Sequence, residues 1–252
     1  MLELPLETAE LKTVNGHQYY VFPQPIAHTN QKDRPTQYAD VKKLETYIGR
    51  GSNRSAKLLP DVMKPAERLM TALLDYGNHI KDWSMQSAVI QSGYRPDDES
   101  QGRGYLKAIK DTIALNPKIF GDVKFPSSLE EEAQSVLGTF GDPRRTAFQK
   151  HVAEAPGWTQ QLAQQLFNIV DKIYAPRGFN PHATGFVFDI DFWIWLPGKD
   201  GKGMELQHGG RTVYSNSILQ SAAGMWLNKY AMQFDFDSYD TSIEVFHLEY
   251  RK

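Results

Sequence analysis

The sequence predicts an α+β fold in which helices pack against a small central antiparallel sheet. Two patterns carry this prediction. Apolar residues recur every three or four positions in 61–80 and 157–174, as on one side of a helix, and they alternate with period two in 185–196, as in a strand. The helical pattern comes early in the chain and the strand pattern late. With 252 residues the chain can bury such a core without disulfides, and it contains no cysteine.

Residues 1–60 are expected to form a partly irregular N-terminal extension. The segment NGHQYYVFPQP at 15–25 indicates a turn and a short aromatic strand that prolines end. The segment IGRGSNRSAK at 48–57 is typical of a flexible link.

Residues 61–252 are expected to form the main domain. Its first helix follows Pro60, and the segment SAVIQSGYR at 87–95 predicts a strand. From about 105 to 175 the pattern is mostly helical, which we interpret as a helical insertion. The later elements are the strand GFVFDIDFWIWL, a return strand MELQHGGRTVY, the helix ILQSAAGMWLNKYAMQF and a last strand SIEVFHLEY.

Charge and hydropathy argue against nucleic-acid binding and against a transmembrane segment. The formal net charge is −2 and no block of Lys or Arg stands out, which argues against binding to nucleic acid. No apolar run approaches the roughly 18 residues that span a bilayer, so no transmembrane segment is expected. The first residues, MLELPLETAELKTV, lack the cationic start and continuous apolar core of a signal peptide.

Two acids interrupt the apolar strand at 185–196. Strict alternation puts Phe186, Phe188 and further apolar side chains on one face, and Asp189 and Asp191 on the other. A carboxylate in such surroundings costs several kcal/mol unless it is paired or binds something.

Histidines accompany these acids. His182 lies just before the strand, and His247 belongs to the last strand. Because the chain has no cysteine, two histidines, an aspartate and a further glutamate are the ingredients of a catalytic zinc site.

Four segments, in order, resemble motifs of the VanY-like M15 peptidases, the zinc D-alanyl-D-alanine carboxypeptidases and dipeptidases that act on bacterial cell-wall peptides. They are SGYR at 92–95 with Gln101 beyond it, NPHATGFVFD at 180–189, GMWLNKYAMQFDF at 224–236 and EVFHLEYR at 244–251. The resemblance covers about 85–252, apart from two stretches, about 105–175 and 192–215, that do not align.

The resemblance implies the M15, or hedgehog-like, zinc peptidase fold with one bound Zn²⁺ ion. His182, Asp189 and His247 would bind the ion. Glu244 would act as the general base, and Arg95 would hold the carbonyl or a carboxylate of the substrate. Both imidazoles are neutral ligands, so a divalent ion would keep a net positive charge.

Further substrate contacts are expected from Gln101, Asn180 and Asp191. The chain also departs from the family pattern. Asn180 replaces a serine, Val187 an alanine, and Val245-Phe246 a Pro-Trp pair.

The change at 245–246 bears on the general base. Ideal alternation sends Glu244 and His247 to opposite faces of the last strand, so Glu244 needs a bend in this segment to reach the metal. Without that bend, Glu249 shares a face with His247 and becomes the rival carboxylate.

The expected function is therefore hydrolysis of peptidoglycan stem peptides, with removal of terminal D-alanine by a D,D-carboxypeptidase. The alternatives are an endopeptidase of the lysis or injected-effector type and a non-catalytic module that binds the wall or a partner. The substrate would place the protein in the periplasm or cell wall. An effector would also have a delivery or immunity partner.

Overall fold

The structure is a computed structural model that describes residues 2–23, 37–49, 55–96, 99–135, 143–173, 181–197, 204–208, 216–238 and 246–251. The chain divides into two compact units. The sheet unit comprises Met1–Pro35, Ala39–Tyr94 and Gly185–Lys252, and the helical unit comprises Thr36–Tyr38 and Arg95–Thr184. Each unit has its own hydrophobic core.

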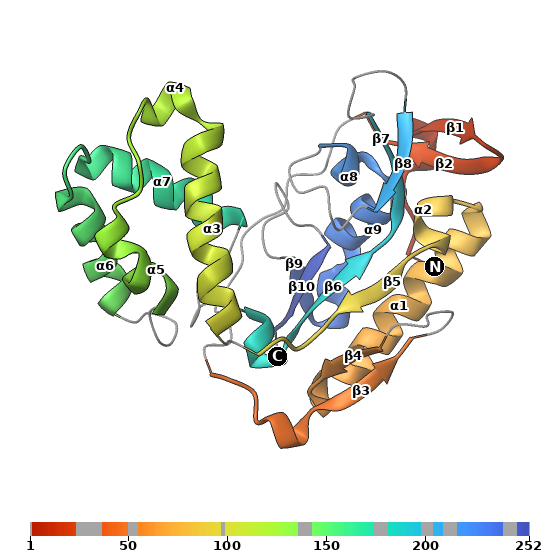
Figure 1. Cartoon of the computed structure of the whole chain (residues 1–252). Coiled ribbons are helices and arrows are strands. Elements are labelled where there is room, and N and C mark those ends of the chain that lie inside the picture. The colour runs from red at the N-terminus through yellow and green to blue at the C-terminus, as the bar shows by residue number, and fades with distance from the viewer. Residues whose placement is uncertain are drawn as a thin grey trace. The chain divides into compact units, whose positions relative to one another are not determined.

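The sheet unit is built on a four-stranded antiparallel sheet with the strand order β5-β6-β10-β9 (Figure 1). These strands span Val89–Ser92, Val187–Asp191, His247–Tyr250 and Phe236–Ser238. Small antiparallel sheets with packed helices confirm the predicted α+β class.

Helix α1, Pro60–Ile80, packs its apolar stripe into the core of the sheet unit. Leu69 and Leu73 of this stripe belong to the same buried cluster as Phe188 and Ile190 of β6. The cluster confirms both the helical periodicity of the segment and the predicted core face of β6. The shorter helices of this unit are η1 (Leu6–Thr8), η2 (Val41–Lys43), α2 (Trp83–Gln86), α8 (Asn216–Gln220), α9 (Ala222–Tyr230) and η6 (Ala231–Phe234).

Two-stranded antiparallel pairs complete the described strands of the sheet unit. They are β1 (Glu10–Val14) with β2 (His17–Val21), β3 (Glu45–Ile48) with β4 (Ser55–Leu58), and β7 (Trp193–Pro197) with β8 (Met204–His208). Asn15 and Gly16 join β1 to β2, and both have positive φ, as the tight two-residue hairpin turn requires. Leu4 and Phe22 are buried in the core of this unit. The expected division into residues 1–60 and 61–252 stays a prediction.

The apolar run at 185–196, expected to be one strand, is two strands in different sheets. β6 pairs with β10, whereas β7 pairs with β8. Phe192 lies between them, and the next backbone N–H, of Trp193, donates to Ser87 Oγ at 2.8 Å. The period-two pattern continues through Phe192 because this residue is as buried as Ile190 and Ile194, so periodicity alone could not reveal the change of partner.

The described part of the helical unit consists of helices around an aromatic core. Its helices are α3 (Glu99–Leu115), α4 (Pro117–Phe120), η3 (Ser127–Leu129), α5 (Glu130–Ser135), α6 (Pro143–Glu154), α7 (Gln160–Ile173) and η4 (Pro181–Thr184). Phe148 of α6 meets Phe167 of α7 edge to face, with ring centroids 5.5 Å apart.

A half-buried polar contact joins three helices of this unit. Asp171 of α7 accepts a hydrogen bond from the hydroxyl of Tyr105 of α3 at 2.9 Å and forms an ion pair with Arg145 of α6. Burial raises the pKa of Asp171, and the positive charge of Arg145 opposes that rise.

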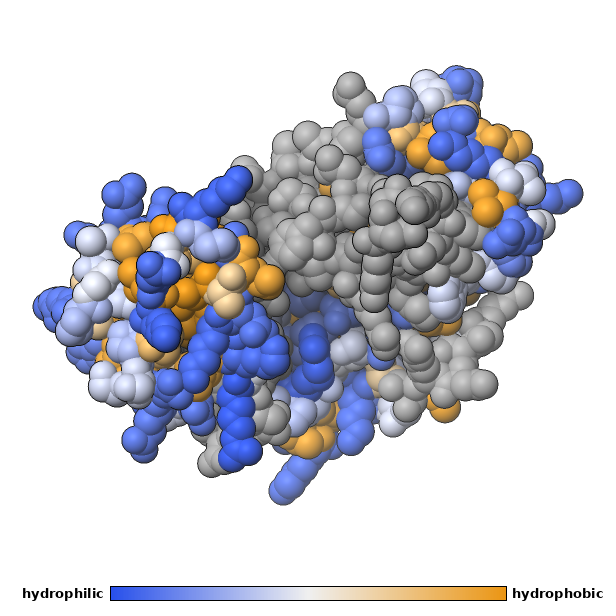
Figure 2. All heavy atoms as spheres, turned by 45° about the horizontal axis from the view of Figure 1, so that its top comes forward, coloured by the Kyte–Doolittle hydropathy of each residue, from blue (hydrophilic) through white to orange (hydrophobic). Residues whose placement is uncertain are grey.

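Hydrophilic side chains project over much of the described surface in Figure 2, with apolar side chains gathered between them. Ile48 and Leu115, the most exposed large apolar side chains among the described residues, lie in different units. No described helix is both long and apolar enough to cross a membrane.

We expect Arg145→Met to lower the free energy of unfolding by about 1–3 kcal/mol, because it leaves the half-buried carboxylate of Asp171 without its cation. Urea unfolding followed by circular dichroism measures the change. Lys150→Met is the control, since it removes an exposed cation from the same helix and should cost less than about 0.5 kcal/mol. Equal losses in the two variants would show that the ion pair between Arg145 and Asp171 adds nothing to the free energy of unfolding beyond the effect of removing an exposed cation.

Candidate metal centre

The pairing of β6 with β10 places Asp189 directly opposite His247. Residues opposite each other in an antiparallel pair have their side chains on the same face and close together. His247 Nδ1 lies 2.9 Å from Asp189 Oδ1. Two residues far apart in the sequence therefore form one polar contact because of the strand register.

His182 is placed by the short helix η4, which leads into β6. The hydroxyl of Thr184 donates to the carbonyl of Pro181 at 2.6 Å within this turn. Gly185 then takes a φ of +72°, and a Cβ there would lie 3.1 Å from each of three side chains. Glycine is thus required on both conformational and steric grounds, as the change from helix to strand occurs at this residue.

His182, Asp189 and His247 each offer one ligand atom, and these atoms lie within 4.8 Å of one another. Both histidines are buried, with exposures of 1% and 5%. Ligand atoms around a tetrahedral zinc ion lie roughly 3–4 Å apart, which follows from bonds of about 2.0–2.2 Å. The three residues therefore fit a metal ion, and two imidazoles with one carboxylate are suitable donors for a first-row transition metal.

More acids lie on the face of the sheet that carries Asp189 and His247. Asp191, Asp237 and Glu249 are all at most 2% exposed. Glu249 Oε2 accepts a hydrogen bond from Arg251 Nη2 at 2.7 Å. Several buried carboxylates on one side of a sheet are costly unless cations or a metal ion compensate them.

The structure describes the other expected site residues to different extents. Arg95 has an exposed side chain, and its backbone N–H donates to the carbonyl of His182 at 3.4 Å. Gln101 lies in α3, where only the backbone is described. Glu244 and Asn180 lie outside the described residues. The roles of these four stay predictions.

The sequence reasoning missed Arg251 and Asp237. A signal for Arg251 was available, since the alternation that joins His247 and Glu249 on one face of β10 extends to position 251. Asp237 gave no comparable signal, because its position opposite Glu249 depends on the pairing of β9 with β10.

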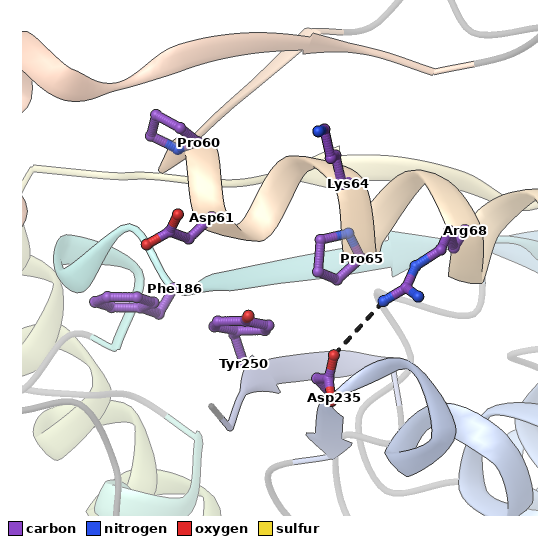
Figure 3. Close-up of a pocket in the computed structure, with 8 residues that line it drawn as sticks. All are labelled: Pro60, Asp61, Lys64, Pro65, Arg68, Phe186, Asp235 and Tyr250. Atoms are coloured by element: carbon purple, nitrogen blue, oxygen red, sulfur yellow. Dashed lines mark ion pairs between the residues drawn. The ribbon is translucent and has the colours of Figure 1, made fainter.

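A pocket of about 910 Å³ lies elsewhere in the sheet unit (Figure 3). It is lined by Pro60, Asp61, Lys64, Pro65, Arg68, Phe186, Asp235 and Tyr250. The rings of Phe186 and Tyr250 are parallel within 2°, and Arg68 pairs with Asp235 at 3.6 Å. Phe186 and Tyr250 alternate with the metal-side residues of their strands, so the pocket lies on the α1 side and contains no member of the triad.

No family model and no curated protein matches the chain. A similar solved structure is that of the LdcB LD-carboxypeptidase, described as revealing the molecular basis of peptidoglycan recognition. It is 13% identical, with a TM-score of 0.40, over 99% of this chain and 88% of that chain.

Isothermal titration calorimetry with Zn²⁺ tests the triad. We expect one site per chain, and His182→Ala or Asp189→Asn should weaken binding by more than about 100-fold, since losing a ligand exceeds the 10–100-fold effect of losing a ligand's partner. His79→Ala, which removes an exposed histidine of the sheet unit, should leave the affinity unchanged. A wild-type protein that binds no metal, or triad variants that bind as tightly as wild type, would exclude this centre.

Proposed function

We propose that this protein is a zinc-dependent peptidase that hydrolyses peptidoglycan stem peptides, and that it removes terminal D-alanine as a D,D-carboxypeptidase. The observation that carries this proposal is the convergence of His182, Asp189 and His247. These are the three positions at which the sequence resembles the metal ligands of the M15 peptidases. Compact clusters of exposed acids are common, whereas two buried histidines beside an aspartate are a more specific arrangement.

The chemistry needs a positive charge, a base and a group that holds the substrate. A zinc ion bound by the triad would supply the positive charge that lowers the pKa of water and polarises a peptide carbonyl. In this proposal Glu244 takes the proton of the attacking water and passes it to the departing amine.

The burial of Glu249 argues against this residue as the base. The side chain of Glu249 is 0% exposed and its carboxylate is hydrogen-bonded to Arg251. A general base must be within reach of the proton that it removes, usually about 2.6–3.2 Å. A fully buried carboxylate held by an arginine is poorly suited to meet a substrate and to exchange protons with solvent.

Arg95 is suited to the substrate side of the reaction. Its exposed guanidinium can form a bidentate pair with a peptide carboxylate or hold a carbonyl oxygen. Its backbone hydrogen bond to His182 ties this segment of the chain to a proposed metal ligand. Gln101, Asn180 and Asp191 are proposed as further substrate or ligand contacts.

The proposed substrate indicates where in the cell the protein would act. Stem peptides are found in the periplasm and the cell wall, so the protein would act there. An immunity or delivery partner belongs to this proposal only if the protein is an injected effector.

Mass spectrometry of muropeptides tests the proposed reaction. With Zn²⁺ present, wild-type protein should shorten a stem pentapeptide by one alanine. Glu244→Ala should bind Zn²⁺ normally yet release D-alanine about 10²–10⁴-fold more slowly, the usual range for loss of a general base.

Glu10→Ala is the matched control, because it removes an exposed carboxylate of β1 in the sheet unit and should leave the rate unchanged. Cleavage inside the stem peptide would show an endopeptidase instead. If zinc-loaded wild-type protein binds peptidoglycan but releases no fragment, the protein is a binding module and the proposed activity is wrong.

A further inference from the structure

His247 lies between two carboxylates, one at each ring nitrogen. Its Nδ1 is 2.9 Å from Asp189 Oδ1, and its Nε2 is 3.7 Å from Glu249 Oε1. Asp189 belongs to the group of three residues whose ligand atoms lie together, and Glu249, which is also described, does not. Nδ1 is therefore the ring nitrogen beside the carboxylate of the triad, and Nε2 is the ring nitrogen beside Glu249.

Glu249 is held so that its two carboxylate oxygens have different neighbours. Oε2 accepts a hydrogen bond from Arg251 Nη2 at 2.7 Å, which leaves Oε1 toward the imidazole. The side chains of His247 and Glu249 share one face of β10, and Arg251, directly after the strand, continues the same alternation.

The neighbouring strand β9 supports this arrangement. Asp237 is opposite Glu249 in the register, and its Oδ2 lies 4.0 Å from Arg251 Nε. The backbone N–H of Arg251 donates to the carbonyl of Asp235 at 2.8 Å, which fixes the end of β10. Charges therefore alternate from Asp189 through the imidazole to Glu249, Arg251 and Asp237.

Burial strengthens the electrostatic interactions among these side chains. The side chains of Glu249 and Asp237 are 0% and 3% exposed, and those of His247 and Arg251 are 6% and 13% exposed. Electrostatic interactions between such groups are screened much less than at the surface. A carboxylate on the far nitrogen of a metal-binding histidine fixes the tautomer and orientation of the ring and makes the ligand more basic.

We propose that Glu249 is a positioning residue for His247. Its carboxylate, 3.7 Å from Nε2, favours the tautomer with the proton on Nε2, which keeps the lone pair of Nδ1 available for the metal. Arg251 holds Glu249 in place, and Asp237 lies beside Arg251. This inference rests on the metal centre of the proposed function. It assigns to Glu249 the orientation of a ligand rather than proton transfer with the substrate.

Calorimetry with Zn²⁺ on folded Glu249→Gln tests the inference. We expect affinity to fall about 10–100-fold, the effect typical of removing a charged partner from a ligand. Asp82→Asn is the matched control: Asp82 is a fully buried carboxylate of the same unit that accepts hydrogen bonds from Tyr20 and Met85. This control should lower the thermal unfolding temperature of the metal-free protein but leave zinc affinity within about threefold.

A Glu249→Gln affinity within threefold of wild type would overturn the proposal. So would equal weakening in Asp82→Asn, since burial of any carboxylate would then explain the effect. If wild-type protein binds no zinc, the metal centre itself fails, which is a separate outcome.

A second measurement uses the wild-type protein and does not depend on a variant that folds poorly. Long-range ¹H–¹⁵N spectra distinguish the two imidazole tautomers, and His247→Asn identifies the signals of His247. We expect the proton on Nε2 in the zinc-loaded protein. A proton on Nδ1 with zinc on Nε2 would overturn the proposal.

Discussion

The pairing of β6 with β10 is the constraint on which the candidate site depends. This register sets Asp189 opposite His247 and brings Nδ1 to 2.9 Å from the carboxylate. A shift of one residue would turn every side chain of one strand to the other face, so the contact would be lost. The register is fixed by the core, because the same shift would move Phe188 or Leu248, which are fully buried, from the apolar core to the polar face of the sheet.

The two faces of the central sheet have different physical roles. On one face, apolar side chains of β6 and β10 pack with α1 in a single core. The other face is also largely buried but carries acids, a histidine and an arginine. Apolar burial on the first face stabilises the strands, and the second face can then hold charged groups that would be unfavourable unless they pair with one another or bind a cation.

Sequence periodicity predicted α1 and the core face of β6 because burial leaves a regular apolar spacing. It could not show that the run at 185–196 changes sheets at Phe192, since that residue is as buried as Ile190 and Ile194. The triad was expected from motif resemblance, and the strand register explains how two of its members meet. Arg251 and Asp237 were missed because their contacts with Glu249 depend on which strands pair, which spacing along one strand does not specify.

The central claim is that His182, Asp189 and His247 together bind one divalent ion, and the coordination shell of the zinc-loaded protein tests it most directly. X-ray absorption spectroscopy at the zinc edge should show two imidazole ligands at about 2.0–2.1 Å, a carboxylate oxygen at about 2.0–2.2 Å, and a fourth light ligand. A shell made only of oxygen atoms, or one with a single imidazole, would contradict the account.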